Sequence, residues 1–202
     1  MLTVNEKKTL REKLVQYEGS VPHMYLDKKG YVTIGVGHLI SNLTAALKLN
    51  LLVGKSGAIA TKEQITADYE AVKKYWKTNA TAPYYKKYTK LILTEVEINR
   101  LTNKHIKGFY SELKRLFPGF ADYPAEVRLA LLDIIFNQGM TKLRGEWPKL
   151  NKAVKTKDWA EAAAESNRPE LGDLRNSYVR ELFEAAAKNA DENISPVIDT
   201  KD

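Results

Sequence analysis

The spacing of apolar and polar residues predicts a helix at the start of the chain. Thr3 and Glu6 have the spacing of a capping box, which favours a helix over residues 4–18. Residues four apart lie on one face of a helix, so Glu18 continues the apolar stripe that includes Leu14. Partial burial there would disfavour the ionised form of the Glu18 carboxyl group.

A β-hairpin is predicted directly after this helix. Two runs of β-forming residues, 24–26 and 31–36, flank the turn-forming segment from Asp27 to Gly30. Such a segment between two β-formers is typical of antiparallel strands joined by a tight turn.

Helical periodicity dominates the rest of the chain. Thr61 and Gln64 cap a predicted helix over residues 62–77, which a loop over 78–83 follows. The basic, aromatic run 84–88 either stacks on sugars or bases, or is an ordinary helix or loop surface. Predicted C-terminal helices cover residues 95–117, an almost wholly apolar stretch over 125–138 that Gly139 ends, a short helix after Asp158, and a last helix from about Asp173 to Lys188.

These elements predict an α+β fold that is mostly α. We expect a single domain over residues 1–202, with an N-terminal lobe over 1–94 and a connecting helix over 95–117. A helical lobe over 118–188 and a flexible polar tail over 189–202 complete it. A cleft between two lobes is a common place for a ligand.

Composition removes several chemistries. The 202 residues include no cysteine, which excludes disulfides, a cysteine nucleophile and cysteine-based metal centres. The histidines His23, His38 and His105 have no metal-binding spacing, so no metal and no cofactor are expected. Lys and Arg outnumber Asp and Glu by 32 to 25, a net charge of +7 that favours anionic partners.

The N-terminus is charged and lacks the apolar core of a secretory signal, and no stretch reaches the length of a membrane span. We therefore expect synthesis in the cytoplasm without a signal peptide. No nucleic-acid motif is evident, and the charges are spread along the chain, so nucleic acid is not an expected partner.

Two carboxylates carry the candidate chemistry. Cleavage of a glycosidic bond needs one protonated carboxyl group to donate to the leaving oxygen and one ionised carboxylate. Glu18 on an apolar face suits the first role, and Asp27 in a turn beside Lys28 suits the second. A glutamate at a helix end and an aspartate in a turn are common, so the pair alone is also compatible with an ordinary solvated helix end and turn.

The run from Tyr25 to His38 closely resembles the catalytic hairpin of phage lysozymes of the T-even type, glycoside hydrolase family 24. In that family a helix-terminal Glu-Gly precedes the hairpin, as Glu18-Gly19 does here, and the separations 27 − 18 = 9 and 33 − 18 = 15 also match. Residues 130–139 and 158–163 and the arginine-containing segments 166–169 and 175–176 resemble later parts of the family sequence.

The resemblance implies a lysozyme-like, two-lobed fold and a muramidase that cleaves the β-1,4 bond between N-acetylmuramic acid and N-acetylglucosamine. It implies that Glu18 is the general acid, and that Asp27 activates a water with help from the Thr33 hydroxyl, with inversion of the anomeric centre. Arg175 would pair with Glu18, and Gly30 would shape the turn.

The resemblance also suggests roles for residues outside the hairpin. Phe136, Asn137 and Gln138 either line the sugar cleft or serve packing alone, and Arg168 either contacts substrate or forms a structural ion pair. His38 is expected to anchor the end of the hairpin. The family usually supplies an acidic partner for this histidine, and His105 stands at that position here.

The insertion and the biological context allow several interpretations. Residues 43–92 contain an insertion relative to the family, which covers the cleft, extends substrate contacts or serves a partner. The expected monomer acts on peptidoglycan strands in the periplasm or outside the cell. It is either a phage endolysin or an antibacterial effector carried by a contractile (type VI) apparatus, with a delivery or immunity protein as partner. The alternatives are a lytic transglycosylase and a non-catalytic module that binds cell wall or nucleic acid.

Overall fold

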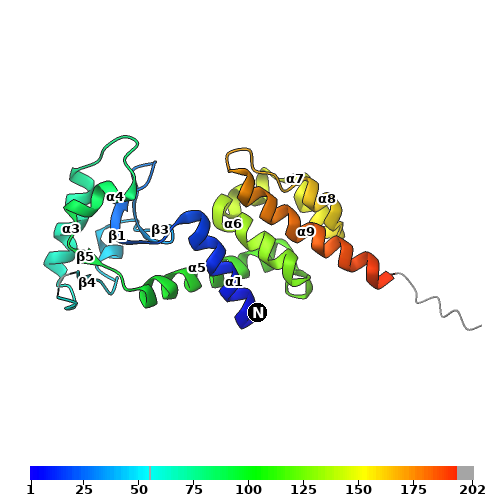
Figure 1. Cartoon of the computed structure of the whole chain (residues 1–202), viewed down its shortest axis with the longest axis horizontal. Helices are drawn as coiled ribbons and strands as arrows, with labels where there is room; N and C mark the ends of the chain where they lie inside the picture. The colour runs from blue at the N-terminus through cyan, green and yellow to red at the C-terminus, as the bar shows by residue number, and fades with distance from the viewer. Residues whose placement is uncertain (55, 195–202) are drawn as a thin grey trace, which may run out of the picture. The chain divides into compact units, whose positions relative to one another are not determined.

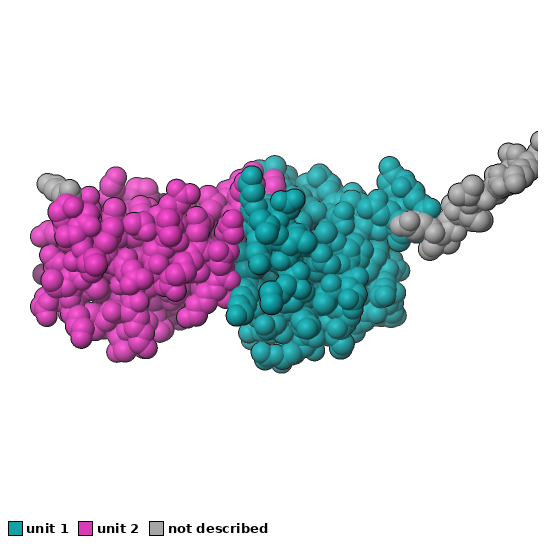
Figure 2. Space-filling model, turned by 90° about the horizontal axis from the view of Figure 1, so that it is seen from below, with its two compact units in different colours: residues 1–10, 106–202 teal, residues 11–105 magenta. Residues whose placement is uncertain are grey.

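The computed structural model describes residues 1–54 and 56–194, and the chain divides into two compact units (Figures 1 and 2). One unit, here called the hairpin unit, comprises residues 11–105. The other, here called the helical unit, comprises residues 1–10 and the described residues from 106 onward. Two helices contribute residues to both units.

These two helices are α1 (Val4–Glu18) and α5 (Glu95–Leu116). The bounds of α1 are those predicted, and its capping box is reciprocal. The Thr3 N–H donates to Glu6 Oε2 at 2.7 Å, and the Glu6 N–H donates to Thr3 Oγ1 at 3.2 Å. Local hydrogen-bonding chemistry thus sets the start of α1, as expected.

The predicted hairpin is confirmed and gains a third strand. Strands β1 (Val21–Leu26), β2 (Val32–Gly35) and β3 (His38–Leu39) form an antiparallel sheet in that order. The register places Tyr25 opposite Thr33 and Leu26 opposite Val32. Residues directly opposite each other on neighbouring strands point to the same face, so Tyr25 and Thr33 share a face of the sheet.

The inserted segment folds against this sheet (Figure 1). It contains α2 (Leu43–Ala46), β4 (Leu52–Val53), α3 (Lys62–Lys74), α4 (Ala82–Tyr85), the 3₁₀ helix η1 (Lys86–Tyr88) and β5 (Leu91–Ile92). The capping box at Thr61 is confirmed, but α3 ends three residues before the predicted Lys77. The loop predicted over 78–83 also ends early, because α4 begins at Ala82.

Hydrogen bonds fasten the insertion to β1. Strands β4 and β5 pair with each other and close its base. His23 Nε2 of β1 lies 2.9 Å from the Ala82 carbonyl oxygen, and the Leu93 N–H donates to the Pro22 carbonyl at 2.8 Å. The buried carboxylate of Asp68 on α3 accepts two backbone N–H groups at the start of β5, each at 2.8 Å. The insertion is therefore held in a defined position on the strand that leads to Asp27.

The helical unit is built from α6 (Ala125–Gly145), α7 (Pro148–Thr156), α8 (Trp159–Ala164) and α9 (Asp173–Ile194), with the 3₁₀ helix η2 (Phe120–Asp122) before them. The predicted burial of the apolar stretch in α6 is confirmed. Gly139 interrupts this helix with φ +76° rather than ending it. The predicted end of the last helix near Lys188 is wrong, since α9 continues to Ile194; residues 195–202 of the predicted tail lie outside the described part.

A buried ion cluster lies inside the helical unit. Asp133 on α6 and Arg168 are fully buried, and Arg168 Nη1 donates to Asp133 Oδ1 at 2.7 Å. Arg175 Nε donates to the same oxygen at 3.1 Å. Burial lowers the pKa of Arg168, and the charge of Asp133 opposes that effect. One carboxylate thus accepts hydrogen bonds from two buried guanidinium groups.

Replacing Asp133 with alanine should destabilise the helical unit strongly, because it leaves buried cations without their shared anion. We expect a loss of about 3–5 kcal/mol in the free energy of unfolding, measured by denaturant titration. Glu184→Ala is the matched control, since it breaks the exposed pair with Arg180 and should change stability by less than about 1 kcal/mol. Equal effects of the two substitutions would contradict this account of the cluster.

Candidate active site

Asp27 directly follows β1 and closes the turn with its own side chain. Its Oδ1 accepts the backbone N–H groups of Lys29 at 2.8 Å and Tyr31 at 2.9 Å. Its backbone N–H donates to the Tyr31 carbonyl at 3.0 Å, and its carbonyl accepts from Gly30 at 2.9 Å. The other carboxylate oxygen, Oδ2, accepts no hydrogen bond from the described residues. One oxygen of this carboxylate is fixed, and the other is available to a ligand.

Gly30 lies in the turn that Asp27 closes. Its φ of +82° is a left-handed conformation that glycine adopts without a Cβ penalty. A Cβ at this position would also lie 3.5 Å from Nε1 of Trp76, which packs on the turn from the insertion.

Thr33 lies on β2 with its side chain buried. Its hydroxyl group donates to the Tyr31 carbonyl at 3.1 Å. A hydroxyl has one donor and two acceptor positions, so this bond leaves its oxygen able to accept a hydrogen bond from a water molecule. The same Tyr31 backbone also pairs with Asp27, so Thr33 and Asp27 are positioned by one short segment.

Glu18 is the last residue of α1, and its side chain is exposed. The expectation that it is partly buried on the apolar face is wrong. The buried stripe of α1 ends one turn earlier, at Leu14, and the chain leaves the helix at Gly19 with φ +77°. Glu18 therefore lies in line with the apolar stripe of α1, but the core that covers this stripe ends before Glu18.

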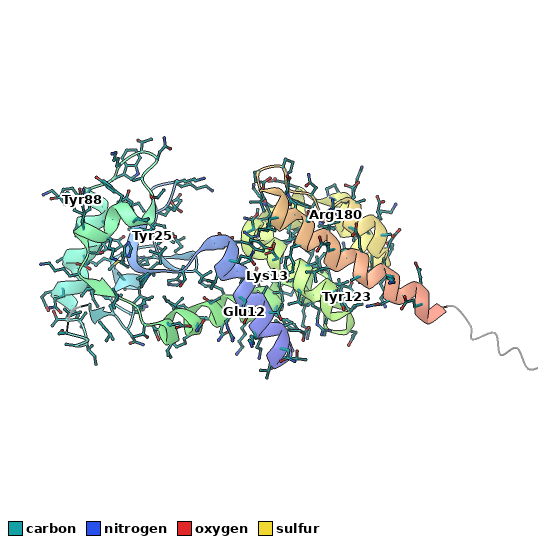
Figure 3. All side chains as sticks on the ribbon, viewed as in Figure 1. Glu12, Lys13, Tyr25, Tyr88, Tyr123 and Arg180 are labelled. Atoms are coloured by element: carbon teal, nitrogen blue, oxygen red, sulfur yellow. The ribbon has the colours of Figure 1, made fainter. Side chains whose placement is uncertain are left out.

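Tyr25 brings the two carboxylates into one electrostatic environment. Burial raises the pKa of its phenol, and the negative charges of Asp27 and Glu18 raise it further. Tyr25, which Figure 3 labels, is therefore a neutral hydroxyl group on β1, close to both carboxylates. Sequence reasoning did not assign it a role; the available signal was its position two residues before Asp27, on the same face of that strand.

His38 on β3 has an imidazole as its partner. Its Nδ1 lies 2.8 Å from Nε2 of His105 on α5. Burial lowers the pKa of His38 to about 4, and the neighbouring His105, Lys104 and Arg100 lower it as well. Burial and Lys104 also lower the pKa of His105. The end of the hairpin is thus held to α5 by a pair of imidazoles that share one hydrogen bond.

The predicted sugar-contacting residues of α6 lie in the helical unit and are partly exposed. Phe136 packs edge-to-face against Phe109, with ring centroids 5.6 Å apart. The Gln138 amide nitrogen donates to Asn137 Oδ1 at 2.6 Å and to a Glu170 carboxylate oxygen at 2.5 Å. These contacts fix the side chains, and their contact with a sugar stays a prediction.

Arg168 does not fit the predicted role in substrate binding. Its side chain is fully buried on Asp133, so a ligand has no access to it. The structural ion pair, which the sequence left open as the alternative, is the observed arrangement. Arg175 also donates to Asp133, and its predicted pairing with Glu18 stays a prediction.

Within residues 1–54 and 56–194, no three His, Asp or Glu side chains are grouped so as to hold a metal ion. The described helices include none that is both long and apolar enough to cross a membrane.

Comparison with known families decides the assignment. The sequence model of the phage lysozyme family matches residues 15–171, well over half of the chain. The chain belongs to the phage lysozyme family. The match includes Glu18, Asp27 and Thr33, and it ends before Arg175. No curated protein sequence matches the chain.

Family membership confirms the resemblance and the fold class that the sequence predicted. The helices and the small antiparallel sheet are those of an α+β, mostly α, lysozyme-like fold. Membership also supports lysis of peptidoglycan as the activity of this phage lysozyme family member.

The imidazole pair predicts a pH-dependent stability. A histidine whose pKa is lower in the folded state than in the unfolded chain binds fewer protons when folded, so stability is lost as pH falls. We expect the free energy of unfolding to decrease between about pH 6.5 and about pH 4, the value for folded His38. His38→Gln should flatten this dependence in denaturant titrations across that range.

The wild-type protein and His38→Gln, compared above pH 7, provide an internal control. Both imidazoles are neutral there, so the two curves of stability against pH should run parallel. An unchanged loss of stability below pH 6.5 in His38→Gln would contradict the role of the pair.

Proposed function

We propose that the protein is a muramidase that hydrolyses the β-1,4 bond between N-acetylmuramic acid and N-acetylglucosamine. Glu18 is the general acid, and Asp27 with Thr33 activates the attacking water. The observation that carries this assignment is the turn at Asp27, where backbone N–H groups hold one carboxylate oxygen and leave the other without a protein partner among the described residues.

The proposed reaction needs only a water molecule and the carboxyl groups of Asp27 and Glu18. Water attacks the anomeric carbon of the muramic acid residue while Asp27 Oδ2 accepts a proton from that water. The bond from the anomeric carbon to the glycosidic oxygen breaks, and Glu18 donates its proton to that oxygen as the glucosamine end leaves. Attack on the face opposite the leaving group inverts the anomeric centre, which is the outcome expected when the second carboxylate activates water.

Thr33 and Tyr25 complete the proposed site. The Thr33 hydroxyl donates to a backbone carbonyl, so it offers the water an acceptor whose direction is fixed. Tyr25 is protonated at neutral pH, because a phenol ordinarily has a pKa of about 10 and the pKa of this one is raised, so it presents a hydroxyl and not a third negative charge beside the two carboxylates. This arrangement leaves Glu18 and Asp27 as the acid–base pair.

Peptidoglycan is the proposed substrate polymer, and a monomer acting in the periplasm or outside the cell is the proposed form. Two routes would bring the enzyme to this substrate: release as a phage endolysin, and injection as an antibacterial effector. The second route requires an immunity protein in the producing cell. The exposed position of Glu18 makes it reachable by such a partner as well as by substrate.

A lytic transglycosylase is the second candidate function within the same chemistry. That reaction uses the acid and closes a 1,6-anhydro ring instead of adding water. The turn at Asp27 favours hydrolysis, because transglycosylation does not need a second carboxylate to activate a water molecule. Mass spectrometry of the released muropeptides distinguishes the two, since hydrolysis gives reducing ends and transglycosylation gives 1,6-anhydro ends.

Glu18→Gln should abolish catalysis while the protein stays folded. The substituted residue is an exposed helix terminus, and loss of a general acid typically costs about 10²–10⁴-fold in rate. The measurement is turbidity loss of purified peptidoglycan, with thermal unfolding to verify the fold. Glu12→Gln, an exposed glutamate on the same helix, is the matched control and should lyse at the parental rate. Full activity in Glu18→Gln would rule out the assignment.

Asp27→Asn separates the two uses of this side chain. The asparagine carbonyl oxygen can accept the same N–H groups of Lys29 and Tyr31, so the turn should persist. It cannot take a proton from water, so lysis should fall by about 10²–10⁴-fold. Asp27→Ala should lose both lysis and stability. Active Asp27→Asn would show that this carboxylate is structural only.

A further inference from the structure

The positive charge of the protein is concentrated in one segment. Residues 71–90 contain six lysines and no acidic residue, so they supply +6 of the net +7. This corrects the expectation that the charges are spread along the chain. The segment covers the end of α3, the connection to α4, and η1, all within the insertion.

Aromatic side chains lie among these lysines. We call the resulting region the tyrosine–lysine surface and define it by Tyr75, Trp76, Lys77, Tyr84, Lys87 and Tyr88. Tyr75, Trp76 and both lysines are exposed, whereas the other two tyrosines are partly exposed. Figure 3 labels Tyr88 in this region and Tyr25 on the neighbouring strand β1.

The surface is ordered by its own contacts. The rings of Tyr75 and Tyr88 stack at 4.1 Å with an interplanar angle of 10°, and Tyr84 meets Tyr88 edge-on at 5.5 Å. Lys87 Nζ lies 4.8 Å from the ring centroids of both Tyr84 and Tyr88, and Lys77 Nζ lies 5.5 Å from that of Tyr84. Such cation–π contacts hold the lysine amines over aromatic faces.

These lysines have no anionic partner among residues 1–54 and 56–194. None of the lysines in residues 71–90 forms an ion pair with an acidic side chain of the described chain. Six like charges in twenty residues repel one another, and an external anion would relieve that repulsion.

The surface borders the catalytic turn. Trp76 packs on Gly30, three residues from Asp27, and its indole ring is 56% exposed. Tyr31, on the other side of Gly30, is 55% exposed and extends the aromatic character toward the hairpin. The bonds from β1 to Ala82 and from Asp68 to β5 keep the insertion in this position.

We infer that the tyrosine–lysine surface is an accessory binding site for the anionic glycan strand of peptidoglycan, next to the stretch that is cleaved. This inference rests on the proposed function. Tyrosine and tryptophan rings present flat apolar faces that stack on the C–H faces of pyranose rings, and their polar atoms reach sugar hydroxyl groups. The lysine amines form charge-assisted hydrogen bonds with the carboxylates of the peptide stems.

Single-stranded nucleic acid is the competing ligand for aromatic and cationic groups. The position of Trp76 favours the glycan, because Trp76 lies against Gly30, three residues from Asp27, within reach of a strand bound at Asp27. Binding measurements with each ligand distinguish the glycan from nucleic acid.

The test measures binding in the Glu18→Gln background, so that the glycan is retained. Cosedimentation with insoluble peptidoglycan is measured for three proteins. They are the Glu18→Gln parent, the parent that also carries Trp76→Ala, and the parent that also carries both Lys77→Gln and Lys87→Gln. We expect the dissociation constant to rise about tenfold or more for each, which corresponds to about 1.4 kcal/mol. The lysine variant should also show weaker salt dependence than the parent.

The matched control carries Lys152→Gln with Lys155→Gln, two exposed lysines on α7 in the helical unit. It has the same change in net charge and should bind within about twofold of the parent. Thermal unfolding verifies that each protein is folded, and the lysine variant decides the matter if Trp76→Ala is unstable. Unchanged binding of the variants, or an equal loss in the control, would overturn the inference.

Parallel measurements with a single-stranded oligonucleotide identify the ligand. Loss of oligonucleotide binding with unchanged peptidoglycan binding would assign the surface to nucleic acid and overturn the inference. Lysis by the wild-type protein is scored separately. If the protein lyses peptidoglycan and the variants bind it normally, only the accessory site fails. If the variants lose binding but the wild type cleaves no glycan, only the muramidase assignment fails.

Discussion

The hydrogen bonds that Asp27 makes to its own turn are the constraint on which the hairpin depends. One carboxylate oxygen accepts two backbone N–H groups that would otherwise point into the turn without partners. These bonds fix the reversal of the chain, and the reversal sets the register that places Thr33 opposite Tyr25. A residue proposed to act on water is thus also the residue that shapes the site, and both uses are satisfied because a carboxylate has two oxygens.

The insertion extends this arrangement instead of adding an independent part. Its base is closed by the pairing of β4 with β5, and its helices contact β1. Burial raises the pKa of Asp68, and the N–H groups of Leu91 and Lys90 oppose that effect by binding the carboxylate. A buried polar group of this kind is stable only when its partners are in place, so it specifies where α3 sits against β5. The position of Trp76 beside Gly30 follows from that specification.

The features that could be predicted from sequence are those determined by neighbours in the chain. The capping boxes at Thr3 and Thr61 and the turn at Asp27 each involve residues within four positions of one another, and all are observed. The features that were missed depend on distant residues. The exposure of Glu18, the burial of Arg168 and the packing of Trp76 on Gly30 are set by where the core ends and by residues many positions away. Periodicity places a residue on a face of a helix, but it does not say whether another element covers that face.

Cationic side chains occur in two contrasting environments in this protein. In the helical unit, Arg168 and Arg175 share Asp133, because a buried guanidinium group without an anion would be strongly unfavourable. In the insertion, six lysines have no acid among residues 71–90, although exposed acids placed between them would reduce their repulsion. The lysines are exposed, and the amines of Lys77 and Lys87 lie over aromatic rings, so the arrangement is tolerated, but it contributes no ion pair to folding. Its stacked rings and unpaired amines gain most when an anionic polymer with apolar faces occupies them, and the polymer that the adjoining hairpin is proposed to cleave has both properties.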